Sequence, residues 1–306
     1  MAEITASMVK ELREKTGAGM MDAKNALVEN KGDIEAAVDW LRKKGLAKAA
    51  KKSGRTAAEG LVAIATSGTK GAVVEINSET DFVARNAEFQ EFVIKTSQIA
   101  LNAKSADNVA TEAYAGGKNV QETLTDLIAK IGENMSFRRA GKLEVSKGAV
   151  VGYIHSALAP TMGKIGVLVA LESDGNNDAL QAVGKKIAMH VAAANPQALD
   201  STSLDPAVVA REKAILTDQA KASGKPDDII AKMMEGRMRK YYEEVCLIDQ
   251  VFVIDGETKI SKVLENASKD AGAPIKLTGY LRFQLGEGIE VEKEDFAAEV
   301  AKAANG

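Results

Sequence analysis

The side chains whose ordinary pKa lies closest to neutral pH are the two histidines, His155 and His190. A neutral imidazole can take up a proton or bind a metal ion near neutral pH. His155 lies in an apolar run typical of a strand, and His190 lies in the helical pattern of residues 187–191. These surroundings favour a structural or interfacial role for both histidines, although a catalytic pairing created by the tertiary structure stays open at this stage.

Phosphate chemistry would require a glycine-rich loop followed by a lysine and a hydroxyl group. The pattern GxxxxGK[ST] does not occur in the chain, and neither does GxGxxG. Segments 117–119 and 163–165 contain Gly-Lys but lack the hydroxyl that would hold magnesium. The sequence therefore predicts no catalytic residue, no metal site, no cofactor and no nucleotide site, so the protein is not expected to be an enzyme.

The most unusual stretch is residues 78–86, Ser-Glu-Thr-Asp-Phe-Val-Ala-Arg-Asn. It follows the apolar run 72–76, which predicts a buried strand, and it precedes a helical pattern. Function concentrates in such loops. Phe82 stands between Asp81 and Arg85 in a chain that is only 4% aromatic. Either this ring folds back over the edge of the sheet, or it is an exposed wedge that meets another macromolecule.

The chain has 306 residues, of which 45% are hydrophobic and 27% charged, with a formal net charge of −3. This composition is typical of a globular protein of two or more domains and gives no overall attraction to nucleic acid. The single cysteine, Cys246, permits neither an internal disulfide nor a thiolate metal cluster. No apolar run approaches the roughly 18 residues that span a membrane, and the N-terminal residues lack the apolar core of a signal peptide. We therefore expect a cytoplasmic protein without nucleotide, DNA or membrane as direct partners.

Residues 1–44 contain three short apolar-striped segments separated by glycine turns, which predict a small helical bundle. The basic, alanine-rich stretch 42–55 predicts a helical linker after it. This stretch could contact a phosphate backbone. However, no aromatic residue interrupts it and the chain is acidic overall, which favours a solvated linker.

An internal repeat begins near residue 59. Segments 60–64 and 71–79 have the pattern of two strands, and segments 148–154 and 166–174 repeat it. In each copy an apolar-striped helix follows, then a second helix and a closing strand. Three antiparallel strands need helices on one face to be stable. The sequence therefore predicts an α+β fold with a duplicated core of two small antiparallel sheets with helices.

The second copy contains a large insert, residues 197–250. Asp205-Pro206 would start one helix and Gly224 would end it, and a methionine- and isoleucine-rich helix follows. The two helices of this hairpin could simply pack on each other, but the amount of apolar surface favours association with another chain. A C-terminal helix is expected within residues 287–306. The loop 173–177 of the second copy lacks the Thr-Asp-Phe-Val element.

Segments 12–22, 80–86, 130–134, 187–192 and 282–290 together resemble the bacterial elongation factor Ts family. Several separated motifs in the right order make the match specific. Members of this family are guanine-nucleotide exchange factors for elongation factor Tu. The resemblance implies five parts: a ubiquitin-associated (UBA)-like helical bundle with the basic linker (1–54), the N-subdomain of the core (55–145), its C-subdomain (146–196 and 251–286), a helical-hairpin dimerisation insert (197–250) and a C-terminal helical module (287–306).

The resemblance also implies a mechanism and its residues. The protein would bind GDP-bound and nucleotide-free elongation factor Tu and promote GDP release by displacing magnesium, so that GTP can bind. The residues implied in magnesium displacement are Thr80, Asp81, Phe82 and Val83. Those implied in partner binding are Leu12, Arg13, Thr16, Gly17, Ala18, Gly19, Met20, Met21, His155 and His190. A homodimer through the 197–250 hairpin would fit the family architecture, but longer inserts near 103–119 and 267–274 leave its geometry open.

Two rival classes of protein remain open. The first is a nucleic-acid-binding translation protein that uses the basic stretch 42–55, and a steep salt dependence of RNA affinity would support it. The second is an enzyme that uses His155 or His190.

Overall fold

A computed structural model of the chain describes residues 4–16, 18–222, 224 and 226–290. Helices, one six-stranded antiparallel sheet and a small two-stranded sheet make up the described fold, which confirms the predicted α+β class. The expected C-terminal helix lies outside the described residues, and so does Gly17. Among the residues described, no helix is long and apolar enough to cross a membrane.

The N-terminal bundle consists of three helices: α1 (Ala6–Thr16), α2 (Met20–Glu29) and α3 (Ile34–Lys52). They enclose a small apolar core of five buried residues, Leu12, Ala23, Ala26, Leu27 and Ala37. The Asp33 side chain caps α3 by accepting a hydrogen bond from the Ala36 N–H at 3.0 Å. The basic stretch is helical up to Lys52, as predicted. It is not a separate element, because α3 continues into it without a break and packs against α6.

The N-terminal half of the core follows the predicted order of elements. Its strands are β1 (Glu59–Ser67), β2 (Lys70–Ser78) and β5 (Met135–Glu144). Its helices are α4 (Asp81–Ala84), α5 (Ala87–Asn102) and α6 (Val120–Ile131). The segment between α5 and α6 contains η1 (Ala106–Thr111), β3 (Ala113–Ala115) and β4 (Lys118–Asn119), and its Val109 is buried in the core.

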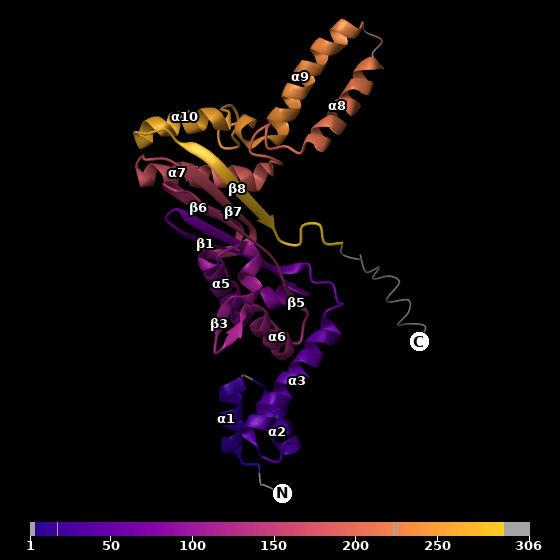
Figure 1. Cartoon of the computed structure of the whole chain (residues 1–306), viewed down its shortest axis with the longest axis vertical. Coiled ribbons are helices and arrows are strands. Elements are labelled where there is room, and N and C mark those ends of the chain that lie inside the picture. The colour runs from indigo at the N-terminus through magenta and orange to yellow at the C-terminus, as the bar shows by residue number, and fades with distance from the viewer. Residues whose placement is uncertain (1–3, 17, 223, 225, 291–306) are drawn as a thin grey trace.

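The C-terminal half has the same plan. Its strands are β6 (Gly148–Ala159), β7 (Met162–Glu172) and β8 (Lys276–Gln284), and its helices are α7 (Asn177–Ala194) and α10 (Ile260–Ala271). Between the two helices the predicted hairpin is present as α8 (Pro206–Lys221) and α9 (Asp227–Val245), followed by η2 (Leu247–Asp249). The hairpin projects away from the core (Figure 1).

The prediction of two separate sheets is wrong in one respect. The strands form one sheet of six, because β1 pairs with the first residues of β7. This junction is short, with Val62 opposite Gly163 and Ala63 opposite Met162. Each half otherwise pairs internally, with β2 between β1 and β5 and β7 between β6 and β8.

The two halves of the sheet also pack face to face. Val62 and Val73 of the first half share a buried cluster with Val150 and Leu168 of the second. Glycine permits the close approach, because a Cβ at Gly166 would lie 2.7 Å from Val62 Cγ1. Helices α5 and α6 cover one outer side, and α7 and α10 cover the other (Figure 1).

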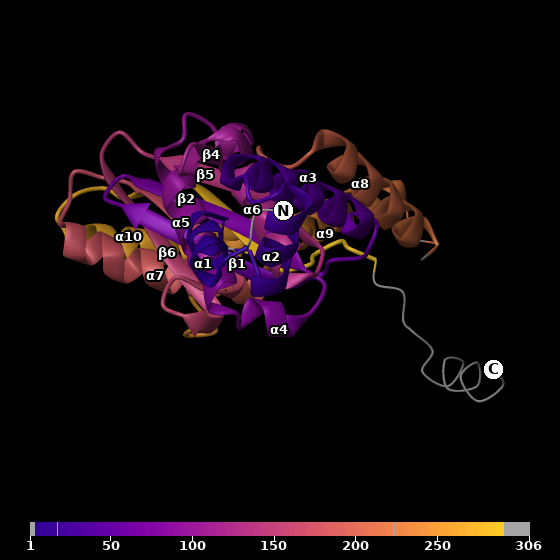
Figure 2. The same ribbon diagram turned by 90° about the horizontal axis from the view of Figure 1, so that it is seen from below.

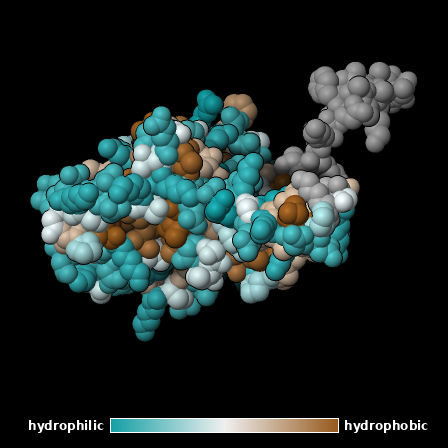
Figure 3. All heavy atoms as spheres, turned by 90° about the horizontal axis from the view of Figure 1, so that it is seen from above, coloured by the Kyte–Doolittle hydropathy of each residue, from teal (hydrophilic) through white to brown (hydrophobic). Residues whose placement is uncertain are grey.

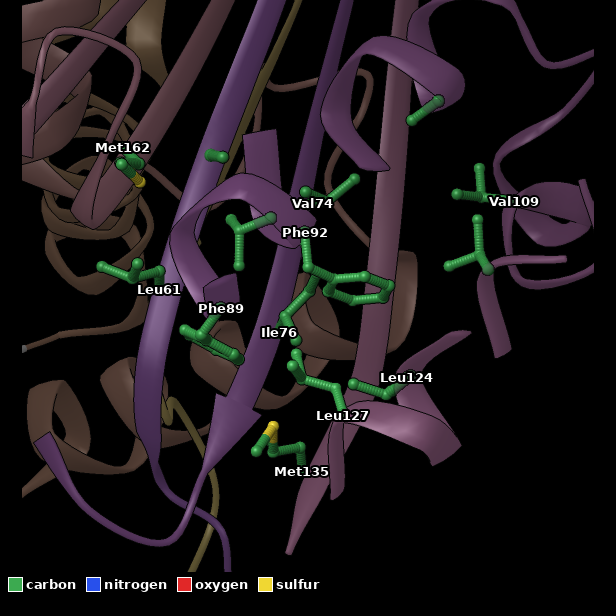
Figure 4. Packing of buried hydrophobic residues seen from close by; sticks show 14 of the residues in the cluster. Leu61, Val74, Ile76, Phe89, Phe92, Val109, Leu124, Leu127, Met135 and Met162 are labelled. Carbon is green, nitrogen blue, oxygen red and sulfur yellow. The ribbon is translucent and has the colours of Figure 1, made fainter. Parts of the chain in front are cut away.

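The largest apolar cluster lies between the first half of the sheet and its helices. Phe89 of α5 lies between Leu61 of β1 and Ile76 of β2, and α6 adds Leu124 to the cluster (Figure 4). Phe92 belongs to the same cluster and stacks on Tyr114 at 5.3 Å between ring centroids. Phe89 is completely buried. Burying such a ring contributes about 2–3 kcal/mol, so this cluster fixes the end of β2 and the start of α5. The loop 78–86 connects these two points.

Candidate functional site

The loop between β2 and α5 contains the single helical turn α4 and presents Phe82 to solvent. The Phe82 side chain is 78% exposed, more than any other large apolar side chain among the residues described. The interpretation in which Phe82 folds back over the sheet edge is therefore wrong. Seen from below, α4 lies at the margin of the molecule (Figure 2).

The residues on either side of Phe82 are anchored. Val83 and Ala84 are buried in the large apolar cluster. Asn86 caps α5, because its Oδ1 accepts hydrogen bonds from the N–H groups of Glu88 (2.9 Å) and Phe89 (3.2 Å). The C-terminal side of the loop is therefore rigidly connected to the core.

The N-terminal side of the loop is held by the segment that follows α6. The Thr80 N–H donates to Glu133 Oε2 at 3.1 Å, and the Thr80 hydroxyl lies 3.0 Å from both Glu133 oxygens. The Glu79 carboxylate accepts a hydrogen bond from the Asn134 N–H and pairs with Arg55 at 3.4 Å. Three segments that are distant in sequence thus meet at residues 79–80.

Asp81 has a weaker attachment. Its carboxylate lies 3.4 Å from Arg85 Nη2, and both side chains are largely exposed. Surface ion pairs of this kind contribute at most about 1 kcal/mol. Asp81 can therefore leave Arg85 and accept hydrogen bonds from another molecule.

Some of the bundle residues predicted to bind a partner are exposed, and others are buried in the core of the bundle. Met20 and Met21 are 61% and 66% exposed and form an apolar surface at the start of α2. Arg13 is exposed, and its Nε donates to the Ala18 carbonyl at 3.3 Å. Leu12, by contrast, is completely buried between the helices, and its contact with a partner stays a prediction. It belongs to the core because it continues the apolar face of α1.

The sequence did not indicate a cleft that lies beside the bundle. Its lining includes Thr16, Ala18 and Gly19. A cavity of about 1000 Å³ separates the bundle from α5 and α6, and these three residues line its bundle side. Phe92 and Lys130 line the opposite side. The cleft is formed by segments far apart in the chain, so no local pattern could have indicated it.

An ion-pair cluster at this cleft joins α2 to α3. The Asp22 carboxylate accepts hydrogen bonds from Lys44 (3.1 Å) and Lys48 (3.2 Å). The hydrogen bond from Lys44 is the main reason that the pKa of Asp22 is lowered; burial opposes it. Two of the basic side chains on α3 are therefore already paired within the chain, and Arg42 pairs with Glu122.

The two histidines differ completely in environment. His155 is exposed near the tip of the β6–β7 hairpin, with the Tyr153 hydroxyl 3.2 Å from its Nδ1. His190 is completely buried in α7, where Nε2 lies 2.9 Å from Gln250 Oε1 and Nδ1 accepts the Val253 N–H at 3.2 Å. Burial lowers the pKa of His190, and the hydrogen bond to Gln250 opposes this shift.

His190 therefore offers no exposed surface in this structure, and its contact with a partner stays a prediction. Both of its ring nitrogens hold the base of the hairpin to α7, and neither is accessible. An enzyme that uses His190 is equally difficult to reconcile with this burial. Within the ranges that the structure covers, no three His, Cys, Asp or Glu side chains are grouped so that they could hold a metal ion.

Glu133 is the site residue whose role sequence reasoning missed. Its segment was noted only as part of a motif. A weak signal was present, because Glu133 follows Gly132, which ends α6 in the left-handed conformation (φ 90°) and turns the chain back toward the sheet. That the turn leads to Thr80 depends on the packing of α6 and could not be predicted.

Comparison with known proteins identifies the family of the chain. The family model of elongation factor TS matches residues 79–287. Elongation factor Ts of Paramagnetospirillum magneticum is 66% identical over 99% of this chain and 98% of its own length. The corresponding proteins of Rhodospirillum centenum and Parvibaculum lavamentivorans are 62% and 58% identical over essentially their whole length. The chain belongs to the elongation factor Ts family.

Proposed function

We propose that this protein acts in translation elongation as the guanine-nucleotide exchange factor of elongation factor Tu in the cytoplasm. It binds the GDP complex of that protein, displaces magnesium and releases GDP, after which GTP can bind. The observation that carries the proposal is the exposure of Phe82 on a loop that is anchored before it by Thr80 and after it by Val83. Family membership supports it.

Exchange requires the factor to bind the nucleotide-poor state better than the GDP-bound state. A nanomolar ligand is held by about 12 kcal/mol, and the coupling between factor and nucleotide is reciprocal. Burying Phe82 in a pocket of the partner would contribute about 2–3 kcal/mol. Asp81 would add hydrogen bonds and fix the direction of the ring. Together they would hold a switch element away from the magnesium ion, whose charge otherwise anchors the phosphates.

The other proposed contacts with elongation factor Tu are assigned to side chains that are exposed. Met20, Met21 and Arg13 on the bundle and His155 on the β6–β7 hairpin are accessible and suited to direct contact with elongation factor Tu. Thr80 and Val83 face inward, so they act by holding Asp81 and Phe82 in place. No catalytic group or nucleotide site is needed for this function.

The same proposal includes the family architecture. The bundle would be UBA-like, the two halves of the core would be a duplication, and the α8–α9 hairpin would form a homodimer. The hairpin supports the last point because Val208, Ile215 and Ile229 are each about two-fifths exposed on it. Apolar patches also interrupt the mostly hydrophilic surface seen from above (Figure 3).

Binding of RNA by the basic stretch has less support. Arg42, Lys44 and Lys48 are paired with acidic residues, and Lys52 donates to the Gly132 carbonyl. Fewer cations are therefore free to replace counterions on a phosphate backbone.

The test is release of a fluorescent GDP analogue from purified elongation factor Tu, with catalytic amounts of this protein. We expect a large acceleration by the wild type and a strong loss with Phe82→Ala. Ile254→Ala serves as the matched control, because Ile254 is also an exposed apolar residue (51%) but lies near the base of the hairpin. No acceleration by folded wild-type protein would refute the function. Normal exchange by a folded Phe82→Ala variant would refute the wedge.

A further inference from the structure

We infer that Glu133 is a positioning residue that keeps Phe82 exposed and ready for its partner. The inference rests on the proposed exchange function of the loop. Glu133 does not touch Phe82; it holds Thr80, two residues earlier.

The contact between Glu133 and Thr80 is a two-point clamp. One carboxylate oxygen accepts the Thr80 N–H at 3.1 Å, and the Thr80 hydroxyl can donate to either oxygen at 3.0 Å. Both residues are half-buried, so water competes only in part. Hydrogen bonds to a charged acceptor are about twice as strong as those between neutral groups.

The base of the clamp is itself fixed. The Asn134 N–H donates to Glu79, and Asn134 Nδ2 donates to the Arg55 carbonyl at 2.7 Å. The Ser78 hydroxyl donates to the Thr80 carbonyl at 2.9 Å. Asn134 is buried, and its hydrogen bond to the Arg55 carbonyl anchors the Glu133 segment at a point outside the loop. The clamp therefore positions Thr80 relative to the sheet.

Exposure of Phe82 has a physical cost that the clamp must offset. A free aromatic ring gains by covering apolar surface, so an unrestrained loop would populate conformations in which Phe82 folds back. Affinity falls in proportion to the fraction of molecules in the competent conformation. By fixing the backbone at Thr80, with Val83 buried on the other side, the chain keeps Phe82 outside.

The first experiment measures catalysed GDP release from elongation factor Tu by Glu133→Ala and Glu133→Gln. Losing both hydrogen bonds should reduce exchange by about tenfold in Glu133→Ala. Glu133→Gln keeps one acceptor and should lose less. Glu144→Ala is the matched control, because it removes one exposed carboxylate at the far end of β5, where it pairs with Lys70 at 3.1 Å. Exchange at the wild-type rate by Glu133→Ala would overturn the inference.

A double variant separates positioning from general destabilisation. If Glu133 acts mainly through Phe82, then Glu133→Ala should slow exchange by a much smaller factor when Phe82→Ala is already present than it does in the wild type. Additive losses would show that Glu133 acts elsewhere and would overturn the inference.

A second readout needs no partner. The chain has one tryptophan, Trp40, so the pair Trp40→Phe and Phe82→Trp places the only indole on the loop. We expect nanosecond anisotropy decay to show greater mobility of this indole when Glu133→Ala is added, and no change with Glu144→Ala. Unchanged mobility would overturn the positioning role even if wild-type protein catalyses exchange. Increased mobility would support it even if the proposed function failed.

Discussion

Replacing Glu75 tests how the two ends of the core are connected. This carboxylate on β2 is completely buried, yet it accepts hydrogen bonds from Arg138 (2.9 Å), Arg139 (2.6 Å) and the Gly286 N–H (2.8 Å). A β-bulge between Glu75 and Ile76 allows both arginines to reach it. Gly286 lies beyond the last strand, so the cluster ties the end of the described chain to the first half of the sheet.

The Glu75→Gln variant keeps the size of the side chain and removes its charge. Removing one member of a buried ion pair costs about 3–5 kcal/mol. Arg138 and Arg139 are 26% and 31% exposed, so water compensates them in part. We therefore expect the free energy of unfolding to fall by about 2–3 kcal/mol at neutral pH.

The pH dependence gives a sharper test of the same cluster. Burial acts to raise the pKa of Glu75, but hydrogen bonds from Gly286, Arg138 and Arg139 outweigh it and the pKa is lowered. A carboxylate with a lowered pKa in the folded state stabilises the protein above its unfolded pKa, and this stabilisation is lost as the pH falls through the folded pKa. The difference between wild type and Glu75→Gln should therefore shrink in acid.

The assay is urea unfolding followed by circular dichroism at several pH values down to about pH 3. Glu144→Gln, which removes an exposed carboxylate from the same sheet, should change the midpoint little. Equal midpoints for wild type and Glu75→Gln at neutral pH would refute the reasoning. A difference that stays constant in acid would show that packing, rather than charge, causes the loss.

Three further predictions concern stability. Gly166→Ala should lower the free energy of unfolding by about 1–3 kcal/mol, because the new Cβ would press on Val62 between the two halves of the sheet. Thermal unfolding measures this loss, and an unchanged midpoint would show that the halves can separate. Because burial lowers the pKa of His190, the free energy of unfolding should decline as the pH falls below about 6.5. Urea unfolding at several pH values should show a weaker pH dependence for His190→Gln. An unaltered pH dependence would mean that another group causes the decline. Asn119→Ala should cost about 1 kcal/mol in chemical unfolding, because it removes the reciprocal cap with Glu122 at the start of α6; no loss would mean that water replaces the cap.

Local patterns predicted most of the elements correctly. The bundle, the strands of both halves and the α8–α9 hairpin were all visible from apolar spacing and from helix-ending residues such as Gly224. The position of the loop 78–86 was also predictable, because a buried strand before it and an apolar-striped helix after it leave little alternative. These features depend on residues close together in the chain.

Features that depend on distant contacts were not predictable. The β1–β7 junction involves two residue pairs and has no sequence pattern. The burial of His190 follows from Gln250 and Val253, which are about sixty residues away. The burial of Leu12, by contrast, was predictable, because its helical spacing already placed it on the apolar face of α1. Its membership of a motif had suggested a contact, but the spacing described its position better.

A comparison of the two halves shows how differently the two equivalent loops are held. In each half, the loop after the central strand meets the end of a helix that terminates in a left-handed glycine, Gly132 of α6 or Gly272 of α10. In the second half this meeting is direct: the Asn176 N–H donates to the Ala271 carbonyl at 2.9 Å, and a Cβ at Gly175 would lie 2.8 Å from Ala271.

In the first half, a glutamate side chain stands between the helix end and the loop. Glu133 reaches Thr80 through its carboxylate, so the loop is held at a distance instead of lying on the helix. The extra space accommodates α4, and Phe82 remains uncovered by the chain. Shortening this connection, as in Glu133→Asp, should therefore draw the loop inward and reduce the exposure of Phe82, which quenching of an indole placed at position 82 would measure. Unchanged quenching would mean that α4, rather than Glu133, sets the distance.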